Sequence, residues 1–267
     1  MNSLEFAKNT GVGEGVKVFE KETMQYQNDP FTLIVVAMPH EAKAVLAWLK
    51  VEEKIKLTQG LLYRGLIFKK PVLLLKTGIG RGVACLPSLL QQWPIQSALL
   101  TGYCGALSPH IKGGEAILAQ TILPSLTTSW ASLDLKVEKA LKIAALQYHK
   151  APLLTVAAPL VTLQQKQAAF MNTHAFGVDM ESLVWAPPLI KAGIPFSAVR
   201  FVYDEQAQSL ENVTEWMGAD GRPRPLKILK TLSEQPTFLF KLPHLKALAQ
   251  QAQASLRQWI GAYFKVE

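Results

Sequence analysis

Short apolar runs alternate with segments of helical periodicity along residues 31–204. FTLIVVAM at 31–38 is continuously apolar and rich in β-branched residues, which is typical of a strand buried on both faces. HEAKAVLAWLK at 40–50 places its apolar residues on one side of a helix. Further strands are predicted at 60–68, 70–78, 97–107, 113–123, 153–162, 176–182 and 194–205, and further helices after the glycine-rich turn at 77–82 and at 135–149, 163–173 and 182–192. Strands and helices in this order predict an α/β fold with a largely parallel, covered sheet.

The same pattern divides the chain into three parts. Residues 1–30 show no strong periodicity and are interpreted as an N-terminal extension, whereas 31–208 contains no convincing linker and forms one domain. The C-terminal segment 209–267 begins with a basic, turn-rich stretch and continues as two or three helices broken by Pro236 and Pro243. We expect this segment to pack on the same domain. Its lysine, arginine and aromatic content leaves peripheral membrane contact open as an alternative.

Composition limits the classes of function. The 267 residues are 49% hydrophobic and 18% charged, so a sizeable core is expected. A net charge of +8 favours anionic partners such as phosphate groups, nucleic acid or an acidic membrane surface, but no nucleic-acid-binding motif is present. The two cysteines, Cys85 and Cys104, have no metal-ligand spacing, and no apolar leader or membrane-length run is found. We therefore expect reduced thiols, no metal site and a cytoplasmic protein.

Polar residues interrupt the apolar strands at their carboxyl ends, which is where open α/β sheets bind ligands. Glu181 is one of them: it lies within the apolar run 176–189, although a buried carboxylate is costly unless it binds a partner. Four other interruptions occur, and together they predict one site better than separate structural accidents would. The five are Glu41, Thr77, the turn Thr101–Gly105, the stretch Asp179–Ser182, and Arg200 with Asp204.

The order and spacing of these segments resemble the purine nucleoside phosphorylase and nucleosidase superfamily, especially its methylthioadenosine and adenosylhomocysteine nucleosidases. The resemblance rests on VVAMPHEAKAV, KTGIGRGVA, LLTGYCGALSPHIKGGEAIL and the stretch from FGVDMES to RFVYD. It implies a three-layer α/β fold whose central sheet is mixed, partly barrel-like and flanked by helices, and a homo-oligomer. Residues 216–259 also resemble the C-terminal part of hopanoid-associated phosphorylases, which implies a lipid-linked nucleoside, adenosylhopane, as substrate.

The resemblance implies a role for each main site residue. Glu41 would activate the attacking water, or else be a helix N-terminal glutamate stabilised by the helix dipole. Glu181 would accept hydrogen bonds from the ribose 2′- and 3′-hydroxyls, with Met180 against the sugar or simply in the core. Asp204 would protonate N7 of the departing purine. Arg200 would help to hold the nucleophile or phosphate, and a salt bridge to Glu41 or Glu181 is its structural alternative.

The remaining candidates surround these groups. Thr77 and the turn after it are expected to bind water or phosphate, and Arg81 follows that turn. Thr101, Gly102 and Gly105 match the family's turn beside the ribose and base. In VAAPLVT the family's polar handle for the base is missing, so Leu160 or Val161 would contact the base through the backbone.

Other departures from the family pattern are Ala106 in place of a glycine and Tyr203 in place of the serine before the acid. The expected reaction is release of a purine, adenine by preference, from a nucleoside. Hydrolysis is slightly favoured over phosphorolysis, because MPHE lacks the phosphorylases' glycine and arginine. Neither route needs a metal or a cofactor, although phosphate is open as a co-substrate. A catalytically inactive nucleoside-binding protein and a methylthioadenosine or adenosylhomocysteine nucleosidase are the alternatives.

Overall fold

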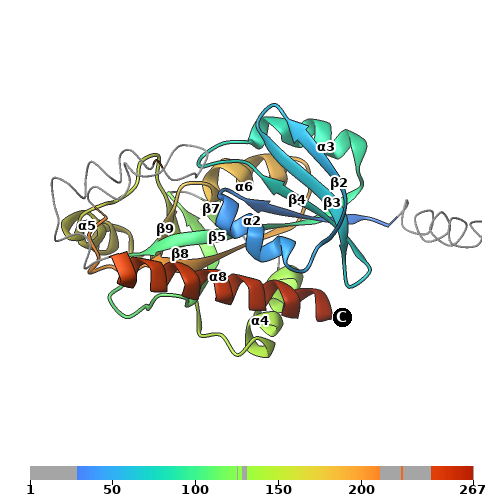
Figure 1. The fold of residues 1–267 in the computed structure, drawn as a ribbon. Helices are drawn as coiled ribbons and strands as arrows, with labels where there is room; N and C mark the ends of the chain where they lie inside the picture. The colour runs from blue at the N-terminus through green and yellow to red at the C-terminus, as the bar shows by residue number, and fades with distance from the viewer. Residues whose placement is uncertain (1–28, 125, 128–130, 211–223, 225–241, 267) are drawn as a thin grey trace, which may run out of the picture.

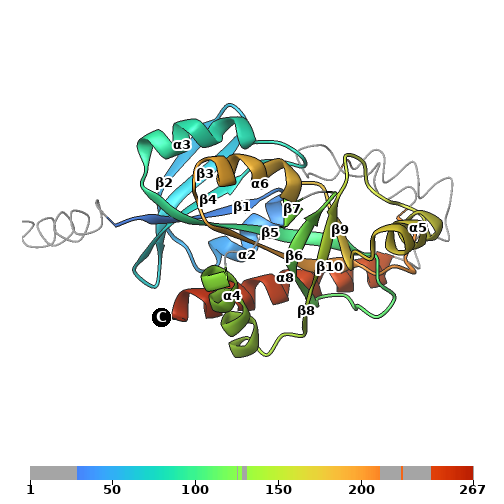
Figure 2. The same cartoon turned by 180° about the vertical axis from the view of Figure 1, so that it is seen from behind.

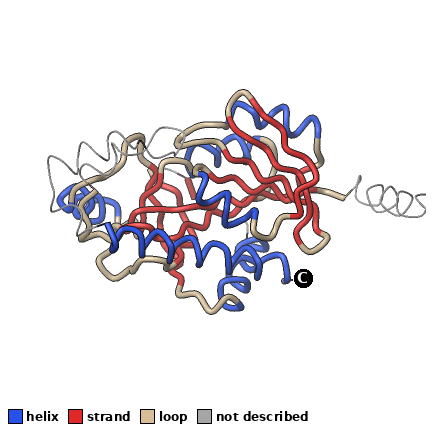
Figure 3. Tube along the Cα trace, viewed as in Figure 1, coloured by secondary structure: helices blue, strands red, loops and turns tan. Residues whose placement is uncertain are grey.

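A computed structural model describes residues 29–124, 126–127, 131–210, 224 and 242–266. In these ranges a mixed sheet lies between helices (Figure 1), and the alternation of strands and helices is easiest to follow in Figure 3. The strands are β1 (Phe31–Val36), β2 (Lys50–Leu57), β3 (Gly60–Ile67), β4 (Lys70–Lys76), β5 (Ile95–Ala106), β6 (Ala116–Leu123), β7 (Leu126–Thr127), β8 (Tyr148–Thr155), β9 (Gly177–Asp179) and β10 (Phe196–Asp204). The helices are α2 (Pro39–Leu46), the 3₁₀ turn η1 (Val83–Cys85), α3 (Leu86–Gln92), α4 (Ala131–Ile143), α5 (Leu163–Thr173), α6 (Ser182–Lys191) and α8 (Leu242–Lys265).

Part of the sheet closes on itself. Its strand order is β10-β6-β8-β9-β5-β1-β4-β3-β2, and β10 pairs with β5 as well, so that β5, β10, β6, β8 and β9 form a ring. Strands β1, β4, β3 and β2 extend from β5 as an open sheet, and β7 pairs with β6. This confirms the mixed, partly barrel-like sheet. The expectation of a largely parallel sheet was wrong, because β2, β3, β7 and β9 add antiparallel pairings to the parallel core around β1 and β5.

The sheet separates two apolar cores, which makes the fold three-layered. Successive residues of β1 point to opposite faces, so Ile34 packs in one core and Leu33 in the other. The first core is covered by α2, α4 and α8, with Trp259 of α8 fully buried. The second is covered by α3 and α6, with Trp185 of α6 fully buried. Figures 1 and 2 show the two helical layers from opposite sides.

Several predicted boundaries were wrong. The helix expected at 135–149 ends at Ile143, and β8 begins at Tyr148 and ends at Thr155, whereas the prediction continued it to 162. Pro159 and the stretch around it instead lead into α5. Strand β2 was not predicted. Its charged sequence, KVEEKIKL, suits an exposed edge strand, where lysine discourages pairing with another sheet.

The C-terminal helix α8 is continuous from Leu242 to Lys265. Pro243 therefore does not break a helix, because it lies in the first turn, where proline has no intrahelical hydrogen bond to lose. Pro236 lies outside the described residues. Within the described ranges, every helix is too short or too polar to cross a membrane.

Candidate functional site

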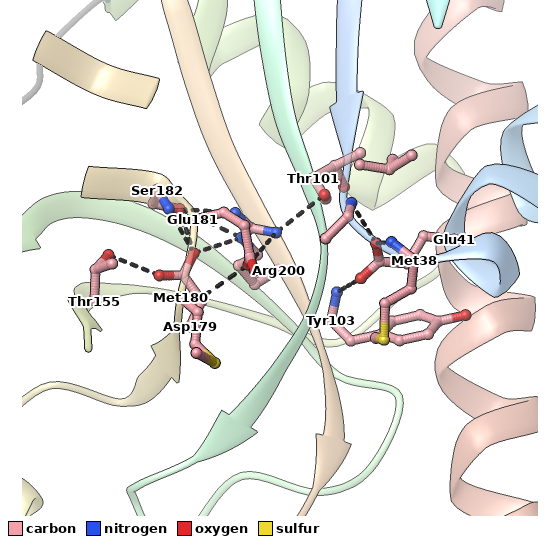
Figure 4. A network of polar contacts seen from close by, with 12 residues as sticks. Met38, Glu41, Thr101, Tyr103, Thr155, Asp179, Met180, Glu181, Ser182 and Arg200 are labelled. Carbon is pink, nitrogen blue, oxygen red and sulfur yellow. Dashed lines mark hydrogen bonds and ion pairs between the residues drawn. The ribbon is translucent and has the colours of Figure 1, made fainter. Parts of the chain in front are cut away.

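The sequence-predicted polar residues converge where β1, β5, β9 and β10 end (Figure 4). Strand β5 runs beside both β1 and β10 in parallel, and its last residues pair with β9. Glu41 follows β1 on α2, Arg200 and Asp204 lie on β10, and Glu181 follows β9. Three segments distant in sequence, arranged around β5, therefore bring Glu41, Glu181, Asp204 and Arg200 to one end of the sheet.

Glu41 is held by backbone amides. It lies in the first turn of α2 and is 1% exposed. Its Oε2 accepts hydrogen bonds from the amides of Ala37 (2.8 Å) and Met38 (2.7 Å), and its Oε1 accepts one from Tyr103 (2.7 Å). Burial raises the pKa of Glu41, while these amides and the charge of Arg200 oppose the rise. Since a carboxylate offers about four acceptor positions, room for one further donor, such as a water molecule, remains.

Gly102 allows Glu41 to take this position. Its φ of +136° favours glycine, and a Cβ there would lie 2.4 Å from Glu41 Oε1. Gly105 plays a similar part beside Asp204, because a Cβ would lie 3.0 Å from Oδ2. Both glycines thus permit a carboxylate to approach β5 closely. Thr101, by contrast, is fully buried, and its hydroxyl donates to the carbonyl of Val199 at 2.9 Å, so its side chain serves the sheet.

The carboxylate of Glu181 is buried but held loosely by the protein. The residue is the N-cap of α6 and is 8% exposed. From the described residues its carboxylate accepts two long hydrogen bonds, from the amides of Gly80 (3.3 Å) and Met180 (3.4 Å), and it lies 3.8 Å from Arg200 Nη1. Burial raises its pKa to about 7, while Arg200 opposes the rise. A buried carboxylate bound this loosely retains the capacity to accept hydrogen bonds from a polar ligand.

Arg200 is the charged centre beneath Glu181. It is 2% exposed, and its Nε lies 2.8 Å from Asp179 Oδ2. Its Nη1 donates to the Thr101 carbonyl at 3.0 Å and its Nη2 to Ser182 Oγ at 3.0 Å. The ion pair with Asp179 is the main contact, and the expected pairing with Glu181 is the weaker one. Most of the guanidinium is therefore committed to the protein, which favours positioning of Glu181 over direct binding of phosphate.

Asp179 anchors this network on the other side. Besides Arg200, it accepts a hydrogen bond from Thr155 Oγ1 at 2.7 Å and bonds from the amide and hydroxyl of Ser182. Four donors of the protein, three of them at Oδ2, therefore hold this carboxylate in place. Met180, next to it, is half-buried.

Asp204 has a partner that the sequence reading missed. It is 5% exposed, and its Oδ2 lies 2.5 Å from the Nζ of Lys166, which is fully buried on α5. A register shift between Val202 and Asp204 on β10 sets Asp204 opposite Gly105, as bulges next to functional sites commonly re-aim a side chain. Burial raises the pKa of Asp204, and the ammonium of Lys166 opposes the rise.

The glycine-rich turn contributes backbone more than side chain. The Thr77 hydroxyl lies 2.9 Å from the Gly78 carbonyl and 3.3 Å from that of Val36, and Thr77 is 8% exposed. The turn then reaches Glu181 through the Gly80 amide. Arg81 is exposed at the end of the turn. The turn thus joins the site at Glu181.

Val161 does not offer a free backbone. Its amide donates to Gln165 Oε1 at 2.8 Å, and its carbonyl accepts from the Leu210 amide at 2.7 Å. A base recognised by this backbone would have to displace one of these partners. Leu160, the other candidate, packs with a small apolar cluster around Val178.

Tyr203, which departs from the family pattern, contacts Tyr103. The rings of Tyr103 and Tyr203 stack with centroids 5.5 Å apart, and both pack in the core covered by α8. Figure 4 shows the Tyr103 ring pointing away from Arg200 and toward that helix. Tyr203 therefore supplies packing where a serine hydroxyl was expected to orient Asp204, and Lys166 supplies the polar contact instead. Within the part of the chain that the structure describes, no cluster of three His, Cys, Asp or Glu residues could hold a metal ion.

Comparison with known families gives one match. The model described as "Phosphorylase superfamily" matches residues 32–234, which is more than half of the chain. None of the curated proteins with which the sequence was compared matches it.

Solved structures share the fold at low sequence identity. Native futalosine hydrolase of Helicobacter pylori aligns with a TM-score of 0.68 at 14% identity, covering 88% of this chain and 97% of its own. The 5′-methylthioadenosine/S-adenosylhomocysteine nucleosidase of Neisseria meningitidis, in complex with methylthio-immucillin-A, aligns with a TM-score of 0.68 at 12% identity, covering 88% and 98%. The corresponding H. pylori nucleosidase aligns with a TM-score of 0.60 at 18% identity, covering 70% and 90%.

Proposed function

Because this chain belongs to the phosphorylase superfamily, we propose that it is an enzyme that cleaves the N-glycosidic bond of a purine nucleoside and releases the free base. The observation that carries the proposal is the meeting of Glu41, Glu181 and Asp204 at one end of the sheet. Each is almost completely buried, although burying a carboxylate without a partner is unfavourable. Three such groups at the carboxyl ends of neighbouring strands are typical of a ligand site in an α/β protein.

Each carboxylate has a separate task in the proposed reaction. Glu181 accepts hydrogen bonds from the two ribose hydroxyls, for which its loosely bound oxygens are suited. Asp204 gives its proton to N7 as the C1′–N9 bond breaks, and the bonding electron pair passes into the purine. Glu41 takes a proton from the water that attacks C1′. The products are the free base and the free sugar, so no cofactor is needed.

Water is proposed as the nucleophile. The Arg200 guanidinium is committed to Asp179, Ser182 and Thr101, and Arg81 is exposed at the edge of the site. These contacts leave little opportunity for the bidentate guanidinium binding that suits phosphate. The similar structures named as a hydrolase and as nucleosidases support the same choice. Phosphorolysis is the alternative, and phosphate dependence separates the two.

The finer substrate assignment is an adenine nucleoside with an apolar group on the ribose 5′ carbon, such as adenosylhopane. Adenine is supported by the structural likeness to nucleosidases named for methylthioadenosine and adenosylhomocysteine. The lipid-like group is supported by the resemblance of residues 216–259, most of which lie outside the described residues. A homo-oligomer, a cytoplasmic location and peripheral membrane contact through the C-terminal segment stay predictions.

Base release from a substrate series tests the proposal. Methylthioadenosine, adenosine, inosine and an adenosine with a long 5′-alkyl group would each be incubated with and without phosphate, and free base measured by chromatography. We expect adenine release from the alkyl substrate without phosphate. Release that requires phosphate would show phosphorolysis, and release from methylthioadenosine alone would show the ordinary nucleosidase. Tight binding of these nucleosides without release would show an inactive binding protein.

A further inference from the structure

Lys166 is an unusual residue for its place in the fold. It lies in the first turn of α5, where the helix dipole disfavours a cation, and it is fully buried, where an unpaired charge is costly. The neighbouring side chains Gln164, Gln165 and Gln167 are exposed. An apolar residue would fill this position at lower cost if packing were its only task. The unfavourable placement therefore indicates that the charge itself is used.

The contacts of Lys166 account for its whole donor capacity. Its Nζ lies 2.5 Å from Asp204 Oδ2, 2.9 Å from the Glu205 carbonyl and 2.8 Å from the Gln208 carbonyl. An ammonium group has three N–H donors, so the three oxygens match the charged form. No donor remains for a substrate. Among the described residues, nothing donates to the other carboxylate oxygen of Asp204, so Oδ1 is the oxygen available to a ligand.

Few other titratable groups face Asp204. Lys166 approaches it from α5, the Cys104 thiol from β5, and Tyr203 precedes it on β10. Cys104 is buried with a pKa well above its usual range, because burial disfavours the thiolate, and burial likewise raises the pKa of Tyr203. Both are neutral near pH 7. Among the residues that the structure describes, Lys166 is therefore the group whose charge stabilises an anion at Asp204.

We propose that Lys166 is a positioning residue that stabilises the carboxylate formed when Asp204 gives its proton to the departing base. The inference rests on the proposed function and deepens it. In the step, the O–H bond of Asp204 breaks and an N–H bond forms at N7, while Lys166 remains an ammonium group throughout. The new negative charge then lies beside a cation that was already in place, which is how preorganised sites stabilise a transition state.

The pairing has two measurable consequences. A cation at this distance makes Asp204 a stronger acid, so it donates its proton more readily. The same cation shortens the pH range over which Asp204 holds its proton, so activity is lost at a lower alkaline pH. Lys166 thus raises the rate of proton donation and narrows the alkaline pH range of activity, and its removal should reverse both effects.

The pH dependence of kcat/KM for Lys166→Met tests the proposal, with Gln167→Met on the same helix as the control. The alkaline limb is first assigned to Asp204 by its absence in Asp204→Asn. We expect Lys166→Met to move this limb to higher pH by about 1–3 units and to lower the maximal rate roughly tenfold, with Gln167→Met unchanged. A merely structural lysine would lower the rate and leave the limb in place. A limb that moves to lower pH would show that Lys166 itself supplies the proton. Either outcome overturns the proposal.

A second measurement is independent of turnover. The ¹³C signal of the Asp204 carboxyl would be titrated without substrate in the wild type and in Lys166→Met. We expect Asp204 to titrate at higher pH in the variant. If Lys166→Met does not fold, Lys166→Gln would be titrated in its place, and an Asp204 signal that titrates as in the wild type would overturn the proposal. If the wild type releases no base, the proposed function fails while this titration still decides the role of Lys166.

Discussion

Glu41 and Asp204 are both buried carboxylates, but the protein holds them with different partners. Glu41 is bound by three backbone amides, from Ala37, Met38 and Tyr103. Asp204 is bound through one oxygen by the ammonium of Lys166. The first set of partners consists of neutral dipoles that are present whenever the chain is folded. The second is a single charge that a point mutation can remove.

The difference suits the two proposed tasks. A base that must accept a proton from water benefits from partners that favour its ionised form at every pH, and the backbone amides at Glu41 do so against the rise in pKa that burial causes. An acid that must release a proton benefits from a nearby cation that stabilises the product anion. Glycine makes both arrangements possible, because Gly102 and Gly105 leave space for the carboxylates against β5.

The largest effect is expected when the proposed acid, Asp204, is replaced and Glu41 is left unchanged. Asp204→Asn keeps the size of the side chain but cannot donate a carboxyl proton, so we expect kcat for base release to fall by about 10²–10⁴-fold. Glu138→Gln, on α4 outside the site and paired with Lys142 and Lys150, is the control and should keep full activity. Wild-type turnover in Asp204→Asn would show that Asp204 is not the acid.

Stability should separate the two carboxylates next. At a pH high enough for Asp204 to be ionised, Asp204→Asn leaves a buried ammonium without its counter-charge, which costs about 3–5 kcal/mol in the free energy of unfolding. Glu41→Gln turns an NH₂ group toward backbone amides that also donate, which costs about 1–3 kcal/mol. Urea unfolding of both variants measures the difference.

The double variant Asp204→Asn with Lys166→Met sharpens this result. Since it removes both charges, it should be more stable than the sum of the two single losses predicts. Equal losses for Asp204→Asn and Glu41→Gln, together with an additive double variant, would contradict the view that a charge holds one carboxylate and dipoles hold the other.

The surroundings of Glu41 could be predicted from the sequence, but the partner of Asp204 could not. Glu41 and the glycine turn of β5 belong to short segments whose order carries the family pattern, and the fold brings them together as expected. Lys166 was missed because its neighbours on α5 are polar, so the local pattern is that of an ordinary surface helix. Its partner lies 38 residues away, and only the bulge at the end of β10 directs that partner toward it.

Backbone contacts were equally hard to anticipate. The sequence named Val161 as a backbone contact for the base, but no residue pattern shows that Gln165 and Leu210 occupy its amide and carbonyl. Strand β2 escaped prediction because its first half is charged and exposed, and only Ile55 and Leu57 alternate with lysine and pack against the core.

Glu181 allows the smallest and most specific test, because it lies between the two cases. Its carboxylate accepts long hydrogen bonds from two amides and forms a long ion pair with Arg200. Burial raises its pKa to about 7. A raised pKa means that the carboxyl gains a proton as the pH falls through 7. The protonated form accepts hydrogen bonds from the ribose less well, so kcat/KM should fall about tenfold per pH unit below that value.

Glu181→Gln should lower kcat/KM at all pH values and abolish this limb, with Glu138→Gln again as the control. A limb that survives in Glu181→Gln would belong to Glu41, and the amide-bound carboxylate would then titrate near neutral pH despite its dipoles.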